Sequence, residues 1–396
     1  TIPNLAIKRI EVLRDGASAQ YGSDAIAGVV NIILDDQPGM EAYGQFSQYY
    51  KGDGTTYQSG AQGGLALGDR GSIVFTGEFS KSDATSRTRQ RPDAAAFQAA
   101  NPDLDVPDPV QRWGQPDLRS VRAGVNAHYD FSDAVTLYAF GTAGNGEGVT
   151  DFNWRNPAST ANVYGNSSAF PGFNFASLYP AGFTPRFGTK YDDYQADAGL
   201  RGAISERLTY DISASSGRSR INYNMHESLN ASMGPDSPTS FYLGRLRQSE
   251  FNLNADFVYR LPLGLFEPAN IAFGAERRKE TYGIRPGDPA SYAIGAGAVT
   301  GLAPNSNGFP GFSPLNAGEW SQTSYAGYVD VEVRPIEAVT LGAAGRYEDF
   351  SAFGDTFNYK LSARFEPVKG VALRGTYSTG FRAPTPAQLN AVNTSQ

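Results

Sequence analysis

Apolar and polar residues alternate along much of this chain from about residue 40 onward. In "TFNYKLSARFE" (356–366), the apolar positions run from Phe357 through Leu361 to Phe365, and polar positions lie between them. The stretches "EFNLNADFVYRL" (250–261) and "SYAGYVDVEVRP" (324–335) repeat the pattern. A period of two places the apolar side chains on one face of a β-strand. The pattern therefore predicts an all-β fold whose strands have one apolar and one polar face.

The pattern indicates about thirteen strands, and these are longer than ordinary strands. Most extend over roughly 10 to 14 residues, whereas strands in globular proteins average about 5 to 6. A strand tilted across a bilayer needs about 9 to 11 residues. The predicted strands are centred near residues 45, 62, 77, 125, 140, 198, 213, 254, 275, 328, 344, 361 and 376.

Short and long connections alternate between these strands. Tight turns are predicted at "GDRG" (68–71), "FSDA" (131–134), "ISER" (204–207), "PIEA" (335–338) and "PVKG" (367–370). Long connections span 81–116, 156–190, 227–245 and 285–321, and two short ones, "KGDGT" and "SAFGD", fall on the same side. Short turns at one rim and long loops at the other are typical of outer-membrane barrels. The sequence therefore predicts an antiparallel transmembrane β-barrel.

A soluble all-β protein is the main alternative, because its strands would alternate in the same way with the apolar face turned inward. Strand length and loop asymmetry favour the membrane barrel over it. The mean hydropathy of -0.38 and the lack of a long apolar window exclude membrane-spanning helices only. A transmembrane strand shows the bilayer only every second residue, so its average can be polar.

Composition narrows the chemistry. The chain has 45 Gly, 22 Tyr and 24 Phe, which suit long strands and turns, and it has no Cys. Disulfides, thiolate metal sites and a Cys nucleophile are therefore excluded. The only two histidines, His128 and His226, are too few for a histidine-rich metal site, and the net charge of -7 argues against nucleic acid as a partner. We expect no cofactor, no metal and no catalytic residues.

The stretch "VLRDGASAQYGSDAIAGVVNIIL" (12–34) differs from everything that follows it. It has neither the Gly-x4-Gly-Lys of a phosphate loop nor the Gly-x-Ser-x-Gly of a nucleophile elbow. We expect a strand over "AIKRIEVLR", one or two helical turns over "ASAQY" ended by Gly22, and a well-buried strand over "AGVVNIIL". The composition changes at "DDQPGM" (35–40), which separates this small αβ element from the strand series.

At these residues the chain resembles a known family. The segment "IKRIEVLRDGASAQYGSDAIAGVVNIIL" (7–34) is similar to the C-terminal end of the plug domain of TonB-dependent outer-membrane receptors. A second segment, "YSTGFRAPTPAQL" (377–389), resembles a mid-barrel motif of the same family. Asp15-Gly16 replaces the family's common Gly-Pro, and Gln388 stands where an acid is frequent. The resemblance divides the chain into the end of the plug domain (1–38) and the N-terminal part of the barrel (39–396).

Receptors of this family have about 22 strands around a plugged lumen, so thirteen strands would form only part of the barrel. The resemblance implies that the bulk of the plug, its TonB-contacting segment and the later strands lie outside this sequence. The first residues, "TIPNLAIKRI", carry no signal-peptide pattern, which also favours a chain that begins inside a longer protein.

The resemblance implies active uptake of a scarce extracellular ligand across the bacterial outer membrane. The expected partners are outer-membrane lipid, lipopolysaccharide, the TonB-ExbB-ExbD energising complex and a small ligand. A siderophore, a vitamin, an oligosaccharide or a peptide all remain open as that ligand. Contacts with it are expected in the long loops, where Asn, Ser, Gly and aromatic residues mix. The run "SRTRQRPDAAA" supplies Arg87, Arg89 and Arg91, which could meet phosphate but more often form a solvated charge run.

The resemblance also assigns roles to individual residues. Charged residues expected to anchor the plug to the barrel are Arg9, Glu11, Arg14 and Arg382. Plug-motif residues expected to set the backbone are Gly16, Tyr21, Gly22, Gly28 and Asn31. The corresponding residues of the barrel motif are Tyr377, Gly380, Phe381, Ala383 and Pro384. The residues that contact the ligand are not indicated.

A passive porin or an adhesin would share the strands and the loop asymmetry, but a porin would lack the plug motif. An outer-membrane hydrolase would need a nucleophile, a base and an orienting acid at the rim. No pattern around either histidine supports such a base. Two unpaired edge strands also predict that the isolated chain aggregates or stays open.

Overall fold

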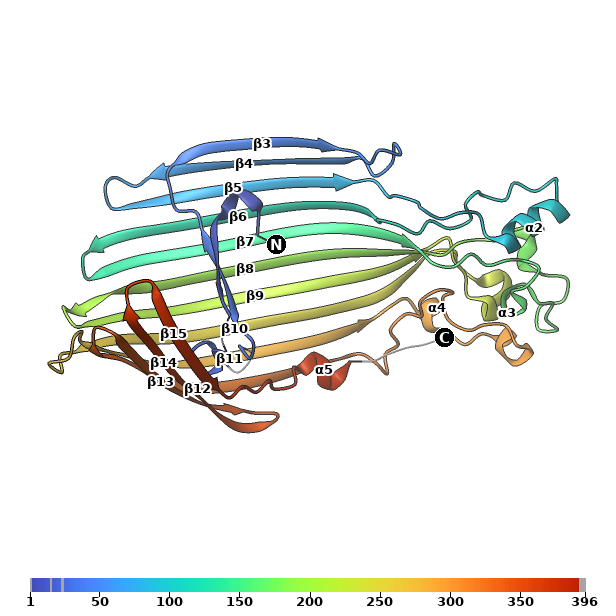
Figure 1. The fold of residues 1–396 in the computed structure, drawn as a ribbon. Coiled ribbons are helices and arrows are strands. Elements are labelled where there is room, and N and C mark those ends of the chain that lie inside the picture. Colours follow the sequence, from blue (N-terminus) through green and yellow to red (C-terminus); the bar gives the residue numbers. More distant parts are fainter. Residues whose placement is uncertain (1, 15, 23–24, 392–396) are drawn as a thin grey trace.

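The computed structural model describes residues 2–14, 16–22 and 25–391. In this part of the chain, thirteen strands form one antiparallel sheet in which every strand pairs with its neighbours in sequence (Figure 1). The predicted number and direction of the strands are therefore confirmed. The two edges of the sheet are its first and last strands, β3 and β15.

The strands of the large sheet are β3 (Gly39–Ser47), β4 (Thr56–Ala66), β5 (Gly71–Ser82), β6 (Asp117–Ser132), β7 (Val135–Asp151), β8 (Arg186–Ser205), β9 (Leu208–His226), β10 (Phe241–Leu261), β11 (Ala269–Pro286), β12 (Gly318–Ile336), β13 (Val339–Phe350), β14 (Gly354–Val368) and β15 (Val371–Ser378). All five predicted tight turns join consecutive strands at one end of the sheet, the turn rim. The four long connections lie at the opposite end, the loop rim (Figure 1).

Several strands are longer than predicted. Strands β8, β9 and β10 contain 20, 19 and 21 residues. Near the loop rim the alternation changes sense: in "RINYN" (220–224) of β9, the polar residues share the face of the exposed Ile212, whereas Ile221 and Tyr223 lie on the opposite face. The face that is apolar at mid-strand is therefore polar there, so the mid-strand pattern ends before the hydrogen-bonded ladder does.

The apolar face of the sheet is exposed, and the polar face is covered. On β14, Phe357 and Leu361 are 63% and 53% exposed, whereas Asn358 between them is 2% exposed. We call the exposed apolar side the outer face and the other side the inner face. This arrangement is the reverse of a soluble sandwich, whose apolar faces pack together.

A charge on the outer face is expected to destabilise the protein in a bilayer. Leu361→Arg should cost about 2 to 4 kcal/mol if position 361 lies near the bilayer midplane, because the cation would be placed in hydrocarbon. Ser362→Arg, on the inner face of the same strand, should cost much less. Chemical unfolding in lipid vesicles measures both variants. Equal losses of stability would contradict the assignment of the two faces.

The first residues form a separate small unit. Strands β1 (Ile7–Leu13) and β2 (Val29–Leu34) pair antiparallel, and the 3-10 turn η1 (Asn4–Ala6) and the helix α1 (Ser18–Tyr21) flank β1. We call residues 2–38 the N-terminal segment. It crosses the strands of the large sheet (Figure 1), with η1 against β4 and β5 and α1 against β12, β13 and β14.

The expectation of a well-buried strand over "AGVVNIIL" is wrong. On β2, Val30 and Ile32 are 63% and 37% exposed. Val30 pairs with Val12, which is also exposed. Strand β2 pairs only with β1, and no further layer of the described residues covers this side of the hairpin. An apolar run thus indicated a strand but not its burial.

The remaining helices are short and lie in the connections. They are α2 (Pro92–Ala100), α3 (Ala161–Tyr164), η2 (Phe175–Ser177), η3 (Ala231–Asp236), α4 (Pro289–Tyr292), η4 (Ala296–Thr300) and α5 (Pro386–Asn390). None of the helices in the described ranges is long and apolar enough to cross a membrane.

Candidate functional site

The N-terminal segment rests on the inner face through separate polar contacts. At one end, the backbone N–H of Asn4 donates to a Glu78 carboxylate oxygen of β5 at 2.9 Å. The Glu78 side chain is 2% exposed, and its carboxylate also accepts from Arg122 Nη1 at 3.0 Å and from the Tyr43 hydroxyl at 3.1 Å. A buried carboxylate is stable there because a cation and two further donors satisfy it.

The link between the N-terminal segment and β3 makes a second set of contacts. Asp35 accepts from Gln62 Nε2 at 2.6 Å through its carboxylate and from Asn126 Nδ2 at 3.0 Å through its carbonyl. The neighbouring Asp36 pairs with Lys8 at 2.6 Å. The hydrogen bond from the Lys8 ammonium is the main cause that lowers the pKa of Asp36. The link is thus fixed both to the sheet and to β1.

At the other end, helix α1 meets the wall through Gln20. Its side-chain amide donates to the Asp330 carboxylate of β12 and accepts from Lys360 Nζ of β14 at 3.3 Å. A polar cavity of 310 Å³ lies beside this contact, lined by all three side chains. A neutral amide bridging two opposite charges on the wall gives a contact of modest strength.

Two glycines shape the turns around α1. Gly22 ends the helix with φ of 102°, a conformation that side chains rarely adopt. At Gly28, an added Cβ would collide with the Leu13 carbonyl oxygen, because β1 and β2 approach closely there. Tyr21, beside Gly22, is exposed.

A buried ion network lies on the inner face close to Gly22. Arg346 of β13 is 2% exposed and pairs with Glu276 at 3.0 Å and with Glu348 at 3.2 Å. Arg278 lies 3.3 Å from Glu276. A Cβ added at Gly22 would lie 3.8 Å from Arg346 Nη2, so this network is part of the inner face that lies next to the end of α1.

The two segments that carry the family resemblance touch each other. A Cβ built on Gly16 would lie 3.5 Å from the Ser378 Cβ at the end of β15. A Cβ built on Gly380 would lie 3.2 Å from the Ser18 hydroxyl and from Ile26. The small residues of the two motifs therefore allow backbones to approach closely where the N-terminal segment meets the sheet.

The four residues predicted to anchor the plug to the barrel are all exposed or about half exposed, whereas Gln20 contacts the wall. Arg9 and Glu11 pair with each other at 2.7 Å and are about half exposed, and Asn31 Nδ2 donates to Glu11 at 3.4 Å. Arg14 is exposed, and Arg382 is exposed beyond the end of β15. Anchoring by these residues stays a prediction.

The contacts that the structure does show were missed in the sequence. Gln20, a backbone N–H of Asn4 and a backbone carbonyl of Asp35 carry three of them. Neutral amides and backbone groups occur throughout any sequence, so no pattern distinguishes them. The acidic pair "DD" at Asp35 and Asp36 was the only available signal.

The barrel motif leaves the sheet after Ser378 and ends in a short helix. Pairing of β15 stops at that residue, well before Pro384. Gln388 stands where the family often has an acid. Its side-chain oxygen accepts from the Thr385 backbone N–H at 3.0 Å, and the Thr385 hydroxyl accepts from the Gln388 backbone N–H. This is a capping box, in which Gln and Glu are equivalent.

Other motif residues pack around this exit. The Phe381 ring lies 5.0 Å from that of Phe353, and Ala383 is buried. Tyr377 is 62% exposed on β15.

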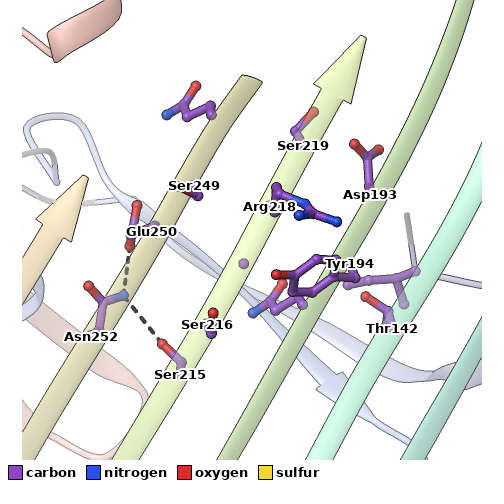
Figure 2. Close-up of a pocket in the computed structure, with 14 residues that line it drawn as sticks. Thr142, Asp193, Tyr194, Ser215, Ser216, Arg218, Ser219, Ser249, Glu250 and Asn252 are labelled. Atoms are coloured by element: carbon purple, nitrogen blue, oxygen red, sulfur yellow. Dashed lines mark hydrogen bonds between the residues drawn. The ribbon is translucent and has the colours of Figure 1, made fainter. Parts of the chain in front are cut away.

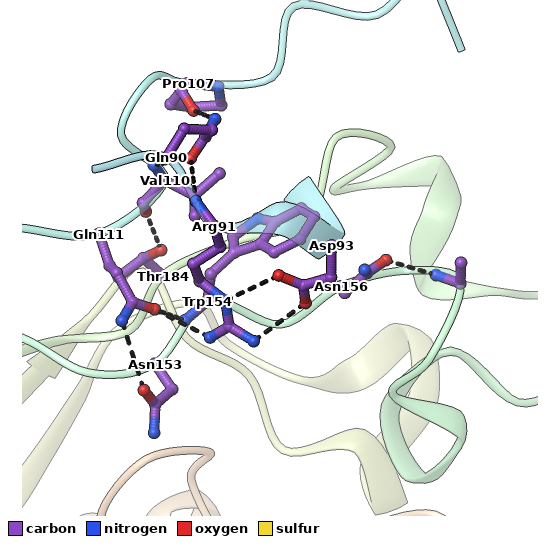
Figure 3. A network of polar contacts seen from close by, with 11 residues as sticks. Gln90, Arg91, Asp93, Pro107, Val110, Gln111, Asn153, Trp154, Asn156 and Thr184 are labelled. Atoms are coloured by element: carbon purple, nitrogen blue, oxygen red, sulfur yellow. Dashed lines mark hydrogen bonds and ion pairs between the residues drawn. The ribbon is translucent and has the colours of Figure 1, made fainter. Parts of the chain in front are cut away.

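The long connections fold into one ordered cap at the loop rim. Figure 3 shows how the first two loops join: Thr184 Oγ1 donates to the Val110 carbonyl at 2.5 Å, and the backbone N–H of Trp154 donates to Gln111 Oε1 at 2.7 Å. Asn307 of the last loop joins the cap by accepting from the Ser228 hydroxyl at 2.6 Å.

The aromatic residues of the loops form the core of this cap. Trp154, Tyr164 and Phe175 are all less than a tenth exposed, and so is Phe312. These rings pack against one another and against neighbouring loops. The expectation that the long loops contact the ligand stays a prediction.

Two of the three arginines of "SRTRQRPDAAA" have acidic partners. Arg87 pairs with Asp53, and Arg91 makes two hydrogen bonds of 2.9 Å to Asp93 (Figure 3). Arg89 is exposed. Two of the three positive charges of this run are therefore neutralised by neighbouring carboxylates.

Acid should loosen helix α2 of the cap. The Arg91 guanidinium lowers the pKa of Asp93, so this pair stabilises the fold above the ordinary aspartate pKa and stops doing so as the pH falls through the lowered value. Trp154 packs against Phe97 of α2 at 5.9 Å between ring centroids. With Trp113 and Trp320 replaced by Phe, Trp154 emission should shift to the red in this acidic range. Asp93→Asn should show the shift at neutral pH, and an unchanged spectrum would contradict the assignment.

A cavity of 460 Å³, lined mainly by polar residues, lies along β7 to β10 beside Ile2 (Figure 2). In it, Asn252 Nδ2 donates to Glu250 at 2.6 Å and to the Ser215 hydroxyl at 3.3 Å. Its other lining residues include Gln195, Ser219 and Gln248. The inner face thus presents small polar side chains beside the N-terminal segment.

The described residues contain no group of three or more His, Cys, Asp or Glu side chains placed to hold a metal ion. His128 Nδ1 lies 3.3 Å from the Ser72 hydroxyl, and His226 Nδ1 lies 3.4 Å from the Ser240 hydroxyl.

Comparison with known families agrees with this arrangement of sheet and N-terminal segment. The family described as "TonB dependent receptor-like, beta-barrel" matches residues 128–396, and the "TonB-dependent Receptor Plug Domain" matches residues 1–29. The chain belongs to the TonB-dependent receptors. These receptors are proteins of the bacterial outer membrane, and the open sheet is part of their barrel.

Individual relatives resemble this receptor chain over different lengths. A vitamin B12 transporter, BtuB of Photobacterium profundum, is 44% identical over 70 residues, which are 18% of this chain and 11% of that protein. The siderophore receptor PirA of Acinetobacter baumannii has a TM-score of 0.58 at 16% identity, over 96% of this chain and 48% of that one. A mutant ferric enterobactin receptor of Pseudomonas aeruginosa, in complex with enterobactin, has a TM-score of 0.63 at 16% identity, over 97% and 50%.

This receptor chain spans about half the length of those solved structures. The likeness to them establishes the fold. In an outer-membrane barrel, short turns face the periplasm and long loops face the outside. The turn rim of the receptor is therefore periplasmic, and its cap of loops is extracellular.

Proposed function

We propose that the protein containing this chain takes up a scarce small ligand across the outer membrane by a TonB-dependent route. The observation that supports this most is the way the N-terminal segment lies on the inner face. It is held by separated polar contacts, such as those of Gln20 and Asn4.

Such an interface suits a plug that is displaced under force. Hydrogen bonds with one charged partner, such as those of Gln20 and Asn4, contribute about 1.5 to 3 kcal/mol each, so separated contacts of this kind can break one after another. The polar cavities beside Gln20 and beside Ile2 would hold water that replaces the broken bonds. We propose that the inner-membrane TonB-ExbB-ExbD complex supplies the force.

The ligand class is supported only through relatives, one of which is a vitamin B12 transporter and two of which are siderophore or ferric enterobactin receptors. We propose a ligand of that size, bound under the extracellular cap. No enzymatic activity is proposed.

Uptake in cells tests this function. Cells expressing the whole receptor are given a radiolabelled ferric catecholate or radiolabelled cyanocobalamin, with and without functional TonB. Accumulation of either compound only when TonB is present supports the proposal. Equal, TonB-independent entry of small solutes would instead support a passive porin, and surface binding without entry would support an adhesin.

A further inference from the structure

The outer faces of β9, β10 and β11 carry a cluster of cations near the loop rim. Register pairs Arg220 with Arg247, and Arg245 with Arg285. Strand alternation places these residues, together with Arg218, on the same face as Ile212 and Leu253, which are 49% and 42% exposed. We call Arg218, Arg220, Arg245, Arg247 and Arg285 the arginine cluster.

The carboxylates of these three strands point the other way. By the same alternation, the inner face carries Asp211, Glu250, Asp256, Glu276 and Glu280. All residues of the three strands are described, and none of their outward-facing side chains is acidic. The outer face additionally carries Arg277 and Lys279 of β11. Opposite charges are therefore separated across the thickness of the wall.

Neighbouring strands neutralise only two members of the cluster. Arg220 pairs with Asp192 of β8, and Arg247 pairs with Glu319 of β12 at 2.6 Å. Arg245 donates to the neutral side chain of Asn222 at 2.7 Å. Within the described ranges, neither Arg245 nor Arg285 has an ion pair.

The cluster surrounds a hollow and is partly unsatisfied. A cavity of 360 Å³ is lined by all five arginines together with Glu319. The guanidinium of Arg218 lies over the Tyr194 ring at 4.9 Å, and its buried Nε has no hydrogen-bond partner among the described residues. Several like charges around one cavity repel one another unless an anion joins them.

The position of the arginine cluster beside the apolar band indicates which kind of anion it would bind. On β10, the outward residues from the turn rim to the loop rim include Leu253, Phe251, Arg247 and Arg245. The cluster therefore lies directly on the extracellular side of the apolar band. If the anionic group belongs to a lipid headgroup, the acyl chains of that lipid would lie against the apolar band.

We propose that the arginine cluster binds the phosphate groups of a phosphorylated glycolipid of the outer leaflet. Arginine suits this ligand because its planar guanidinium donates two parallel hydrogen bonds to phosphate oxygens. The acyl chains of the lipid lie along Phe251, Leu253 and Ile212. This site is separate from the inner face, so the proposal does not depend on the ligand that the receptor transports.

Binding of lipid A by the whole receptor in detergent micelles tests the proposal. Fluorescent diphosphorylated lipid A is titrated against the receptor and against its variant Arg218→Gln/Arg245→Gln/Arg285→Gln. This variant should bind at least about tenfold more weakly, because charge-assisted hydrogen bonds to phosphate are lost. The matched control is Lys51→Gln/Lys81→Gln/Arg119→Gln, which removes three exposed cations from the same rim but from β5, β6 and the β3–β4 connection, and it should stay within about twofold.

A comparison of lipids keeps the test independent of whether the variant folds. The unaltered receptor should prefer diphosphorylated lipid A over its dephosphorylated form by at least about tenfold. Equal binding of both lipids, or equal weakening by the control variant, would overturn the proposal. Complete displacement by inorganic phosphate at the concentration of the lipid would show a site for free phosphate and would also overturn it.

Discussion

Oxidising a receptor that carries Gly16→Cys and Ser378→Cys is expected to abolish energised uptake, and a reductant is expected to restore it. The Cβ atoms of these positions lie 3.5 Å apart, within the range of about 3.5 to 4.5 Å that a disulfide requires. The chain has no native cysteine, so no other disulfide can form within residues 1–396. It would tie the N-terminal segment to β15, and the force on the plug could not displace that segment.

The matched control is a disulfide within the wall. Gly342→Cys and Ser362→Cys join β13 and β14 at directly paired positions, and a Cβ built on Gly342 lies 3.9 Å from the Ser362 Cβ. Its oxidation should leave uptake unchanged, since both residues belong to the sheet. Because a Cβ at position 16 also comes within 3.0 Å of the Ile26 carbonyl, the reduced Gly16→Cys protein gives the baseline. Full uptake by the oxidised Gly16/Ser378 pair would mean that the segment need not move.

Replacing Arg346 by Met is expected to destabilise the fold by about 3 to 5 kcal/mol, because the change leaves buried carboxylates without their cation. Arg346 and Glu348 are both nearly inaccessible, and Glu276 shares the same guanidinium. Chemical unfolding in detergent micelles measures the loss. Arg364→Met provides the control, since that arginine is 46% exposed and pairs with Glu366 at the surface. Exposed pairs are worth about 0 to 1 kcal/mol.

The cause of that loss can be separated from a loss of packing. Adding Glu276→Gln and Glu348→Gln to Arg346→Met removes the unpaired charges, so the triple variant should regain part of the stability. A triple variant less stable than Arg346→Met alone would show that packing, and not charge, holds this part of the inner face.

The strand series was predictable because the same physical rule acts at every position. On β14, lipid on one side and a polar interior on the other impose strict alternation, which Phe357, Asn358 and Leu361 display. The rule fails where the alternation changes sense, as at Ile221 and Tyr223 of β9, and the loop-rim ends of β8, β9 and β10 were accordingly missed. It also fails for β2, since the run "VVNIIL" indicates a strand without showing what covers it.

The contacts of the N-terminal segment were less predictable than its fold. Charge and motif predicted anchoring by Arg9, Glu11 and Arg14, which stays a prediction. The wall contacts that the structure shows are made by Gln20, by the Asp35 carboxylate and by backbone groups. Partner choice depends on which distant strand a side chain reaches, and Gln20 and Lys360 are far apart in sequence. The outward orientation of the arginine cluster likewise follows only from the register of β9, β10 and β11.

Cysteine pairing at the end of β15 tests the central geometry most directly, namely that the first residues lie across the polar face while the apolar face is turned to lipid. Gly16→Cys is combined either with Ser378→Cys or with Tyr377→Cys, which is 62% exposed on the adjacent position of the strand. Disulfide formation is then measured in outer membranes. The structure predicts rapid formation with position 378 and none with position 377. Equal formation with both, or formation with position 377 alone, would contradict it.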